Sequence, residues 1–234
     1  MSAQAGRVET TRGGERPRDR VIDGAIVRYT AGERITHWIV AIAFILAALS
    51  GLAMFHRAVF WFSVFFGGGP WTRVLHPFIG VFMMLAFVLL AVLVQSDNRM
   101  SAADWRWLRQ WRDVLGNREE RLPEVGRYNG GQKLIFFVQI LCLVGLLVSG
   151  IIFWRPYFAS YFSIPVIRIA ALVHAICAFV LIIAIITHIY AGIWVRGSVR
   201  AMTRGLVSPG WAWKHHRAWF REVTNGTSPR PGAH

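Results

Sequence analysis

The stretch IAALVHAICAFVLIIAIITHIYAGIWV, residues 169–195, decides the fold. It contains no Asp, Glu, Lys or Arg, and it is longer than the roughly 20 apolar residues that an α-helix needs to cross about 30 Å of hydrocarbon. Its two histidines are His174 and His188. The stretch is therefore predicted to be a transmembrane helix that carries two histidines.

Three further apolar stretches precede it, at residues 35–55, 75–94 and 134–154. Hydrophobic residues make up 55% of the 234-residue chain, charged residues only 16%, and the mean hydropathy is +0.43. The first stretch follows a 34-residue polar segment and has no small-residue cleavage site, so it is not a signal peptide. Cys142 and Cys177 give no disulfide framework and are expected to be inert apolar residues. We expect an all-α fold, an integral membrane four-helix bundle.

Three regions follow from this pattern. Residues 1–34 alternate Arg with Glu and Asp and are expected to form a disordered tail. Residues 35–200 form the four-helix membrane domain, and residues 201–234 form an interfacial C-terminal segment. Segments rich in Trp and Phe at residues 58–71, 105–111 and 211–220 are predicted to anchor the chain at the membrane surface.

The basic residues indicate how the bundle is oriented. The net charge is +14, and the sequence holds 26 Lys and Arg. The tail holds 7 of these, the loop between the second and third stretches 8 and residues 196–234, after the fourth stretch, 7, whereas the two other loops hold 2 each. By the positive-inside rule, both termini and the long loop are cytoplasmic. The charge is thus explained by membrane topology, and we expect membrane lipid but no nucleic acid as a partner.

Four histidines lie at two depths in the predicted bundle. His37 and His188 are near the cytoplasmic level, and His76 and His174 are near the outer level. The 14 residues between His174 and His188 span about 21 Å of helix and return to nearly the same face. Neutral imidazole is a common axial ligand of haem iron, so the pattern predicts two haems, one above the other.

Other interpretations of these histidines are open. A single intramembrane histidine can simply form an interhelical hydrogen bond, and zinc is disfavoured because two histidines per level leave a tetrahedral site incomplete. His56 is an alternative outer ligand. Pro77 places His76 at a helix start rather than inside a helix. His215 and His216 are expected to face solvent.

A faint internal repeat supports the outer pair. LSGLAMFHR at residues 49–57 is similar to VSGIIFWRP at residues 148–156. Ser50 precedes His76 by about the same distance as Ser149 precedes His174. The repeat therefore relates the first two stretches to the last two and pairs His76 with His174.

Several strings give the chain a resemblance to a known family. They are RITHW around His37, RVLHPFIG around His76, GRYNGGQK at residues 126–133, GIIFWRPYFASYF at residues 150–162, THIYAGIWVRGSVRAM at residues 187–202 and VSPGWAWKHHRAWFRE near the end. The sequence resembles the cytochrome b (gamma) subunits of respiratory formate dehydrogenases over roughly residues 28–222.

The resemblance implies two b-type haems, an inner one bound by His37 and His188 and an outer one bound by His76 and His174. It also implies a quinone site, for menaquinone or ubiquinone, beside the inner haem. Its residues would be Asn129, Gly131, Gln132 and His188. Taken without the resemblance, N-G-G is also a turn signal, and these residues could simply cap the third helix.

The resemblance further implies an electron conduit and anchor rather than an enzyme by itself. Electrons from an iron–sulfur (beta) subunit and a molybdenum or tungsten catalytic (alpha) subunit would pass through the outer and inner haems to quinone, in the inner membrane of a bacterium. A cytochrome b subunit of a hydrogenase or of another molybdenum oxidoreductase is the nearest alternative. A haem-free four-helix transporter or scaffold is an alternative of another class.

Overall fold

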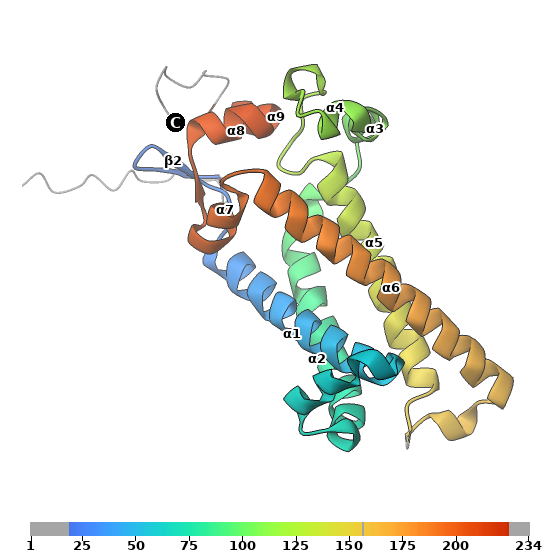
Figure 1. Cartoon of the computed structure of the whole chain (residues 1–234). Coiled ribbons are helices and arrows are strands. Elements are labelled where there is room, and N and C mark those ends of the chain that lie inside the picture. Colours follow the sequence, from blue (N-terminus) through green and yellow to red (C-terminus); the bar gives the residue numbers. More distant parts are fainter. Residues whose placement is uncertain (1–18, 156, 225–234) are drawn as a thin grey trace, which may run out of the picture.

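The computed structural model describes residues 19–155 and 157–224. Its framework is four long helices, each long and apolar enough to cross a membrane (Figure 1). They are α1 Ala31–Phe55, α2 Gly69–Val94, α5 Gly130–Ile152 and α6 Ile164–Trp194. The predicted four-helix architecture is confirmed, and the chain is a multi-pass membrane protein.

Each helix begins four to six residues before its predicted apolar stretch. The first turns are polar or contain proline, so hydropathy alone does not detect them. Thr30 and Glu33 form a capping box at the start of α1, and Pro70 and Pro165 occupy the first turns of α2 and α6.

The earlier start of α2 corrects the expectation for His76. This residue lies inside the helix, and α2 continues through Pro77. Proline disfavours a helical conformation in the residue before it, but within a membrane the surrounding helices allow an internal proline. The side chain of His76 is therefore carried by a continuous helix.

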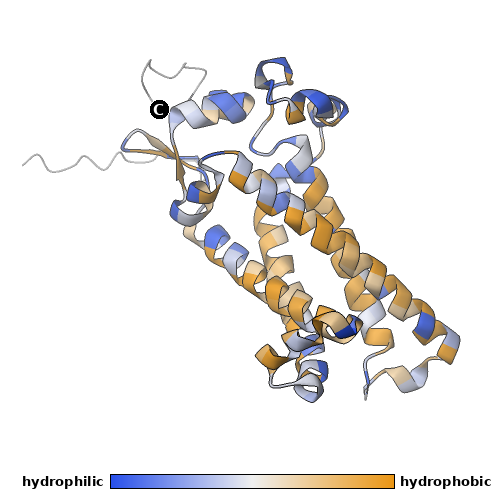
Figure 2. Ribbon diagram, viewed as in Figure 1, coloured by the Kyte–Doolittle hydropathy of each residue, from blue (hydrophilic) through white to orange (hydrophobic). Residues whose placement is uncertain are grey.

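The four helices pack as two pairs, α1 with α2 and α5 with α6, and the pairs meet chiefly through α2 and α5. Figure 2 shows hydrophobic residues along all four helices and hydrophilic residues gathered at the end that carries α3, α4 and α7 to α9. The buried residues between the helices are Ala43, Met83, Phe87, Cys142, Leu143 and Leu181. Many other apolar side chains of these helices are exposed, as expected for surfaces that face lipid.

Short helices connect the long ones. At one end, η1 Arg57–Phe66 joins α1 to α2, and η4 Ala159–Tyr161 lies between α5 and α6. At the opposite end, the long connection from α2 to α5 contains η2 Gln95–Asp97, α3 Ala102–Arg109, α4 Trp111–Leu115 and η3 Glu119–Arg121. The membrane-surface role of η1, α3 and α4 stays a prediction.

A small folded unit, here called the cap, covers the end of the bundle that carries α3. It contains β1 Val21–Ile22, β2 Ala25–Val27, α7 Ser198–Arg204, β3 Leu206–Val207, α8 Pro209–His215 and α9 Arg217–Val223. The strands form one antiparallel sheet in the order β1-β2-β3, in which Ile26 pairs with both Val21 and Val207. The expectation of disorder up to residue 34 is therefore wrong from residue 19 onward, and residues 1–18 lie outside the described residues.

The cap has its own core, which corrects the expectation of a merely interfacial C-terminal segment. Its buried residues come from both ends of the chain and are Ile26, Ala201, Val207, Ala212, Trp219 and Phe220. Trp219 and Phe220, which were expected to anchor the membrane surface, are each only 2% exposed. His216, which was expected to face solvent, is also 2% exposed. Residues 225–234 of the predicted segment are not among those described.

Gly205 allows the cap to close. Its φ is +85°, and an added Cβ would lie 2.6 Å from the carbonyl oxygen of Tyr29. The Gly205 carbonyl accepts hydrogen bonds from the backbone N–H groups of Arg28 and Tyr29. Only glycine permits both the positive φ and this close crossing of the two ends of the chain.

Candidate haem and quinone sites

The structure brings the four intramembrane histidines together in the two expected pairs. His37 of α1 faces His188 of α6, with 6.2 Å between the ring centroids. His76 of α2 faces His174 of α6, also with 6.2 Å between the ring centroids. One helix thus supplies one histidine to each level, and the opposing histidines come from two different helices.

The separation of the rings fits ligation of one metal ion between them. Two imidazoles that bind opposite sides of a metal ion with bonds of about 2.0 Å have ring centroids about 6 Å apart. Directly hydrogen-bonded or stacked rings would lie closer together. Both pairs therefore have the spacing that axial ligation of a haem iron requires.

Ser50 fixes the tautomer of His76. The Ser50 hydroxyl donates its single hydrogen to the carbonyl oxygen of Leu46 at 2.8 Å, one turn earlier in α1. In the hydrogen bond between this hydroxyl and Nδ1 of His76, also 2.8 Å long, the histidine is then the donor and the hydroxyl oxygen the acceptor. Nδ1 carries the hydrogen, and Nε2 keeps the lone pair that a metal ligand needs.

The second half of the repeat contains the same arrangement. The Ser149 hydroxyl bonds the carbonyl oxygen of Gly145 in α5 and lies 3.0 Å from Nδ1 of His174. Glycines follow both serines: an added Cβ at Gly51 would lie 3.2 Å from Cε1 of His76, and one at Gly150 would lie 3.3 Å from Cε1 of His174. The S-G dipeptide of each repeat thus holds the ring by its hydroxyl and makes room for it beside the helix.

Small residues leave space next to all four histidines. The residue four positions later, on the same helix face, is in every case Gly or Ala: Ala41, Gly80, Ala178 and Gly192. A Cβ added at Gly80 or Gly192 would meet no protein atom within 4 Å. A flat macrocycle that is ligated by the histidine can therefore lie against the helix at these positions. Sequence spacing alone gives this signal once the histidines are paired.

The inner pair has a different environment. Nδ1 of His37 is buried and has no hydrogen-bond partner among the described residues, and no serine holds it. The Trp38 ring stands edge-on to the His37 ring, and its Nε1 donates to the carbonyl oxygen of Met202 at 3.3 Å. His188 is exposed on α6. The inner pair is therefore held less tightly by polar contacts and lies next to the cap.

The remaining histidine candidates have other roles. Nδ1 of His56 accepts a hydrogen bond from the backbone N–H of Ala58 and caps η1, so His56 does not belong to the outer pair. His216 lies in the cap, away from the long helices.

The predicted quinone motif forms the start of α5. Asn129 is the N-cap: its side-chain oxygen accepts from the backbone N–H of Gln132 at 2.9 Å, and the Gln132 side-chain oxygen accepts from the Asn129 N–H at 3.0 Å. The turn-and-cap interpretation is therefore correct for these side chains. Gln132 is nonetheless exposed and Asn129 half-buried, so both remain accessible to a ligand. Because α5 runs antiparallel to α6, the motif and His188 lie at the same end of the bundle.

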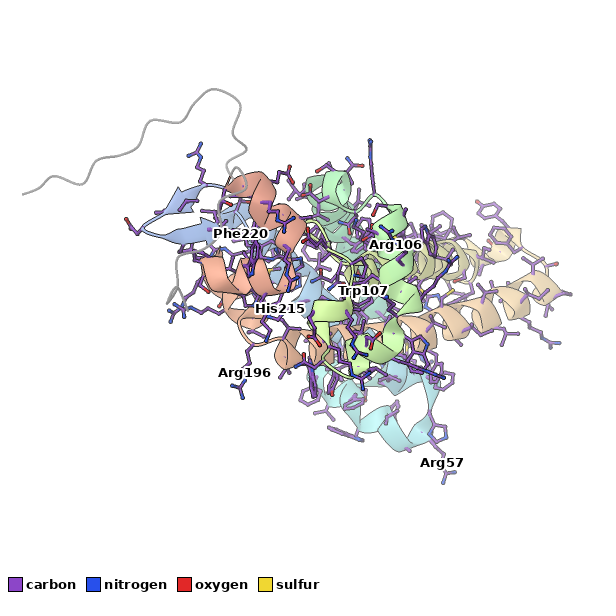
Figure 3. The ribbon with its side chains drawn as sticks, turned by 90° about the horizontal axis from the view of Figure 1, so that it is seen from above. Arg57, Arg106, Trp107, Arg196, His215 and Phe220 are labelled. Atoms are coloured by element: carbon purple, nitrogen blue, oxygen red, sulfur yellow. The ribbon has the colours of Figure 1, made fainter. Side chains whose placement is uncertain are left out.

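The two glycines of the motif accommodate α3. A Cβ at Gly130 would lie 2.6 Å from the carbonyl oxygen of Asp104, and one at Gly131 would lie 3.0 Å from the ring of Trp107. Trp107 is labelled in Figure 3, on the helix that crosses the start of α5. Gly131 is thus required by close helix packing, whatever its part in ligand binding.

Lys133 completes the contact, and sequence reasoning missed it. Its buried Nζ lies 2.7 Å from the carboxylate of Asp104 and 2.9 Å from the carbonyl oxygen of Arg99. Burial would raise the pKa of Asp104, but the hydrogen bonds from Lys133 and Ser101 outweigh it and lower that pKa below its ordinary value. The S-A-A-D pattern at residues 101–104 predicts a capping box and could have located Asp104.

Comparison with known proteins identifies the family of this chain. The profile of the family described as prokaryotic cytochrome b561 matches residues 28–205. The formate dehydrogenase cytochrome b556(fdo) subunit of Escherichia coli K12 is 46% identical over 205 residues, which cover 88% of this chain and 96% of that protein. The formate dehydrogenase cytochrome b556 subunit of Haemophilus influenzae is 42% identical, over 86% of this chain and 84% of that protein. The nitrate-inducible formate dehydrogenase cytochrome b556(Fdn) subunit of Escherichia coli K12 is 41% identical, over 85% of this chain and 91% of that protein.

The matched region contains all four long helices and both histidine pairs. Membership of a cytochrome b family implies haem b as the cofactor, and the residues present fit that group. The chain belongs to the prokaryotic cytochrome b561 family, in the group that includes the formate dehydrogenase cytochrome b556 subunits.

Proposed function

We propose that this chain is the dihaem cytochrome b subunit and membrane anchor of a formate dehydrogenase complex. The observation that carries the proposal is the two histidine pairs, each with one member on α6 and with ring centroids 6.2 Å apart. His37 and His188 would hold an inner haem b, and His76 and His174 an outer one. Because Nδ1 of His76 and of His174 is engaged by a serine hydroxyl, Nε2 would be the nitrogen available to bind the iron.

When bound, the two haems would supply one-electron transfer across the membrane, from an iron–sulfur subunit at the outer level to a quinone beside the inner level. The chain's own residues hold and separate the two metal sites, and its lipid-facing side chains keep water from them. Asn129, Gly131, Gln132 and His188 would bind the quinone head group. Reduction of the quinone needs two electrons and two protons, and we propose that the protons come from the cytoplasm.

The partners and the location follow from the same proposal. An iron–sulfur (beta) subunit and a molybdenum or tungsten catalytic (alpha) subunit would supply electrons from formate, and the complex would lie in a bacterial inner membrane. The basic cap and the long α2–α5 loop would face the cytoplasm, in agreement with the positive-inside rule. The named relatives favour formate over hydrogen as the ultimate electron donor.

The test uses membranes that contain the whole complex with His174→Ala or His188→Ala, and with His56→Ala as a matched control. Reduced-minus-oxidised spectra should show one haem b instead of two in each of the first two variants, because each removes one axial ligand. Formate-driven reduction of a short-chain quinone should stop in both, whereas His56→Ala should retain two haems and activity. Retention of both haems in either ligand variant would refute the ligand assignment. If hydrogen but not formate drove the reduction of the quinone, the assignment of formate as the electron donor would be wrong.

A further inference from the structure

Three consecutive backbone carbonyls tie the cap to the segment that precedes the proposed quinone motif. The carbonyls of residues 125–127 accept, in chain order, from the backbone N–H of Ala218 at 3.2 Å, from Nδ1 of His216 at 2.9 Å and from Nη2 of Arg28 at 2.6 Å. The donors come from α9, from the residue between α8 and α9, and from the end of β2. Both ends of the described chain therefore hold this one segment.

Arg28 and His216 act as one unit. Nη2 of Arg28 lies 3.1 Å from Nε2 of His216, and because arginine only donates, Nε2 is the acceptor. Nδ1 of His216 therefore carries the hydrogen that is donated to the carbonyl oxygen of Gly126. Burial, with Arg28 adding to it, lowers the pKa of His216 well below its ordinary value, which keeps the ring neutral as this arrangement requires.

The unit cannot easily move. Arg28 is 1% exposed and His216 2% exposed. The Arg28 guanidinium lies 4.9 Å from the ring centroids of both Trp211 and Trp219. Such close packing on all sides restrains both side chains.

The tethered segment leads directly into the motif. Only Tyr128, which is buried, separates it from Asn129, the first residue of the capping box that starts α5. Gly130, within the motif, and Lys133, directly after it, contact α3. The accessible amide groups of Asn129 and Gln132 are thus located between two fixed points, the cap and α3.

We propose that Arg28 and His216 are positioning residues for quinone binding, because they fix the backbone that presents Asn129 and Gln132 to the head group. The inference rests on the proposed function, since it concerns the same quinone site. Neither side chain would touch the quinone. Their loss should therefore weaken quinone binding and leave both haems and the maximal electron-transfer rate in place.

The experiment compares Arg28→Met, His216→Phe and His216→Asn in membranes that contain the whole complex. Haem reduction is started with 2,3-dimethyl-1,4-naphthoquinol or with decylubiquinol, and the half-saturating concentration and the maximal rate are measured separately. Arg28→Met and His216→Phe should raise the half-saturating concentration about five- to tenfold, the scale of one lost buried hydrogen bond. His216→Asn keeps a donor for the Gly126 carbonyl and should stay within about twofold of the parent.

Arg221→Gln is the matched control. Arg221 bonds Glu124 at 3.0 Å and links the same two regions, but both side chains are exposed, so no change in the half-saturating concentration is expected.

Asn129→Ala separates the hypothesis of the quinone site from the hypothesis that Arg28 and His216 position it. If it raises the half-saturating concentration but Arg28→Met and His216→Phe do not, the positioning role is wrong and the quinone site stands. If Asn129→Ala has no effect, the quinone site itself is wrong.

Loss of the fold is distinguished by the haem spectrum. If Arg28→Met or His216→Phe lacks the two-haem spectrum, quinol saturation is measured in Arg28→Lys instead. This variant keeps the positive charge but loses the planar group that bridges His216 and the Arg127 carbonyl. A two-haem Arg28→Lys variant with a raised half-saturating concentration supports the positioning role. The same variant with parental quinol saturation overturns it.

Discussion

Ser50 and Ser149 give the outer histidine pair a support that the inner pair lacks. Each hydroxyl accepts from Nδ1 of the neighbouring histidine, His76 or His174. Such partners of a metal ligand orient the ring and typically contribute 10- to 100-fold in metal affinity. The two proposed haem sites should therefore differ in their sensitivity to loss of a hydroxyl.

Ser50→Ala and Ser149→Ala should each weaken retention of the outer haem by at least about tenfold and leave the inner haem unchanged. The measurement is haem content during dilution in detergent, together with a potentiometric titration that separates the two haems. Thr72→Ala is the control, since that buried hydroxyl on α2 donates to the carbonyl oxygen of Gly68 and contacts neither histidine pair. Equal weakening of both haems would contradict this account.

Gly80 and Gly192 test whether the space beside the histidines belongs to haem. Apart from the backbone of its own helix, no atom of the described residues lies within 4 Å of a Cβ at either position, so the protein alone should accept a larger residue. Gly80→Leu should therefore lose the outer haem, and Gly192→Leu the inner one, with normal amounts of folded protein. Quantification of haem per chain is the measurement.

Gly32→Leu provides the comparison for these variants. Gly32 also has no atom within 4 Å of an added Cβ, but it lies at the start of α1 and is not one turn from a proposed ligand. It should keep two haems. If Gly80→Leu and Gly192→Leu also keep two, the space is not occupied by haem.

The contact between α3 and α5 depends on a buried ion pair. Lys133→Met would leave the carboxylate of Asp104 buried and unpaired, which costs about 3–5 kcal/mol. Replacing both residues, as Asp104→Asn with Lys133→Met, should recover a large part of that loss. Thermal unfolding of the purified complex, followed by tryptophan fluorescence, measures the difference.

A surface pair in the same connection serves as the control. Arg118 and Asp113 are 3.4 Å apart, and the Arg118 side chain is 55% exposed. Arg118→Gln should therefore cost less than about 1 kcal/mol. A Lys133→Met variant that is no less stable than Arg118→Gln would mean that α3 does not depend on this pair.

The elements differ in how well the sequence predicts them. The four long helices and the depth of each histidine are local patterns, because hydropathy runs and positions within one helix contain the necessary information. The pairing of the histidines follows from matching those depths between helices. Helix starts were missed because capping side chains are polar. The position of Gly131 against Trp107 could not be predicted, since it depends on where a helix from another part of the chain packs.

At the scale of the whole molecule, the cap was the main feature that sequence reasoning missed. Its strands have two or three residues and show no periodic pattern. Its core joins residues near both ends of the chain. The charge of Arg28 was attributed to topology alone, whereas its side chain is buried at the centre of this unit. Only the tertiary structure distinguishes such an arginine from its exposed neighbours.

The cap should become less stable as the pH falls. The pKa of His216 is lowered well below its ordinary value of 6.5 by burial, and positive charge from Arg28, Arg127 and His215 also opposes its protonation. Below pH 6.5 the unfolded cap binds a proton that the folded cap excludes. Folding stability therefore decreases with falling pH in this range, by up to about 1.4 kcal/mol per pH unit.

Tryptophan fluorescence and limited proteolysis of the haem-loaded protein between pH 7.5 and pH 5 should report this opening, since Trp211 and Trp219 lie against Arg28. In His216→Asn the titrating group is absent while a donor to the Gly126 carbonyl remains, so the pH dependence should become flatter. Asp19 and Asp97 form ion pairs with Arg127 in the parent and in the variant alike, so they do not distinguish the two proteins. An identical acid-induced opening in the parent and in His216→Asn would mean that another group controls the cap, because no other change separates the two proteins.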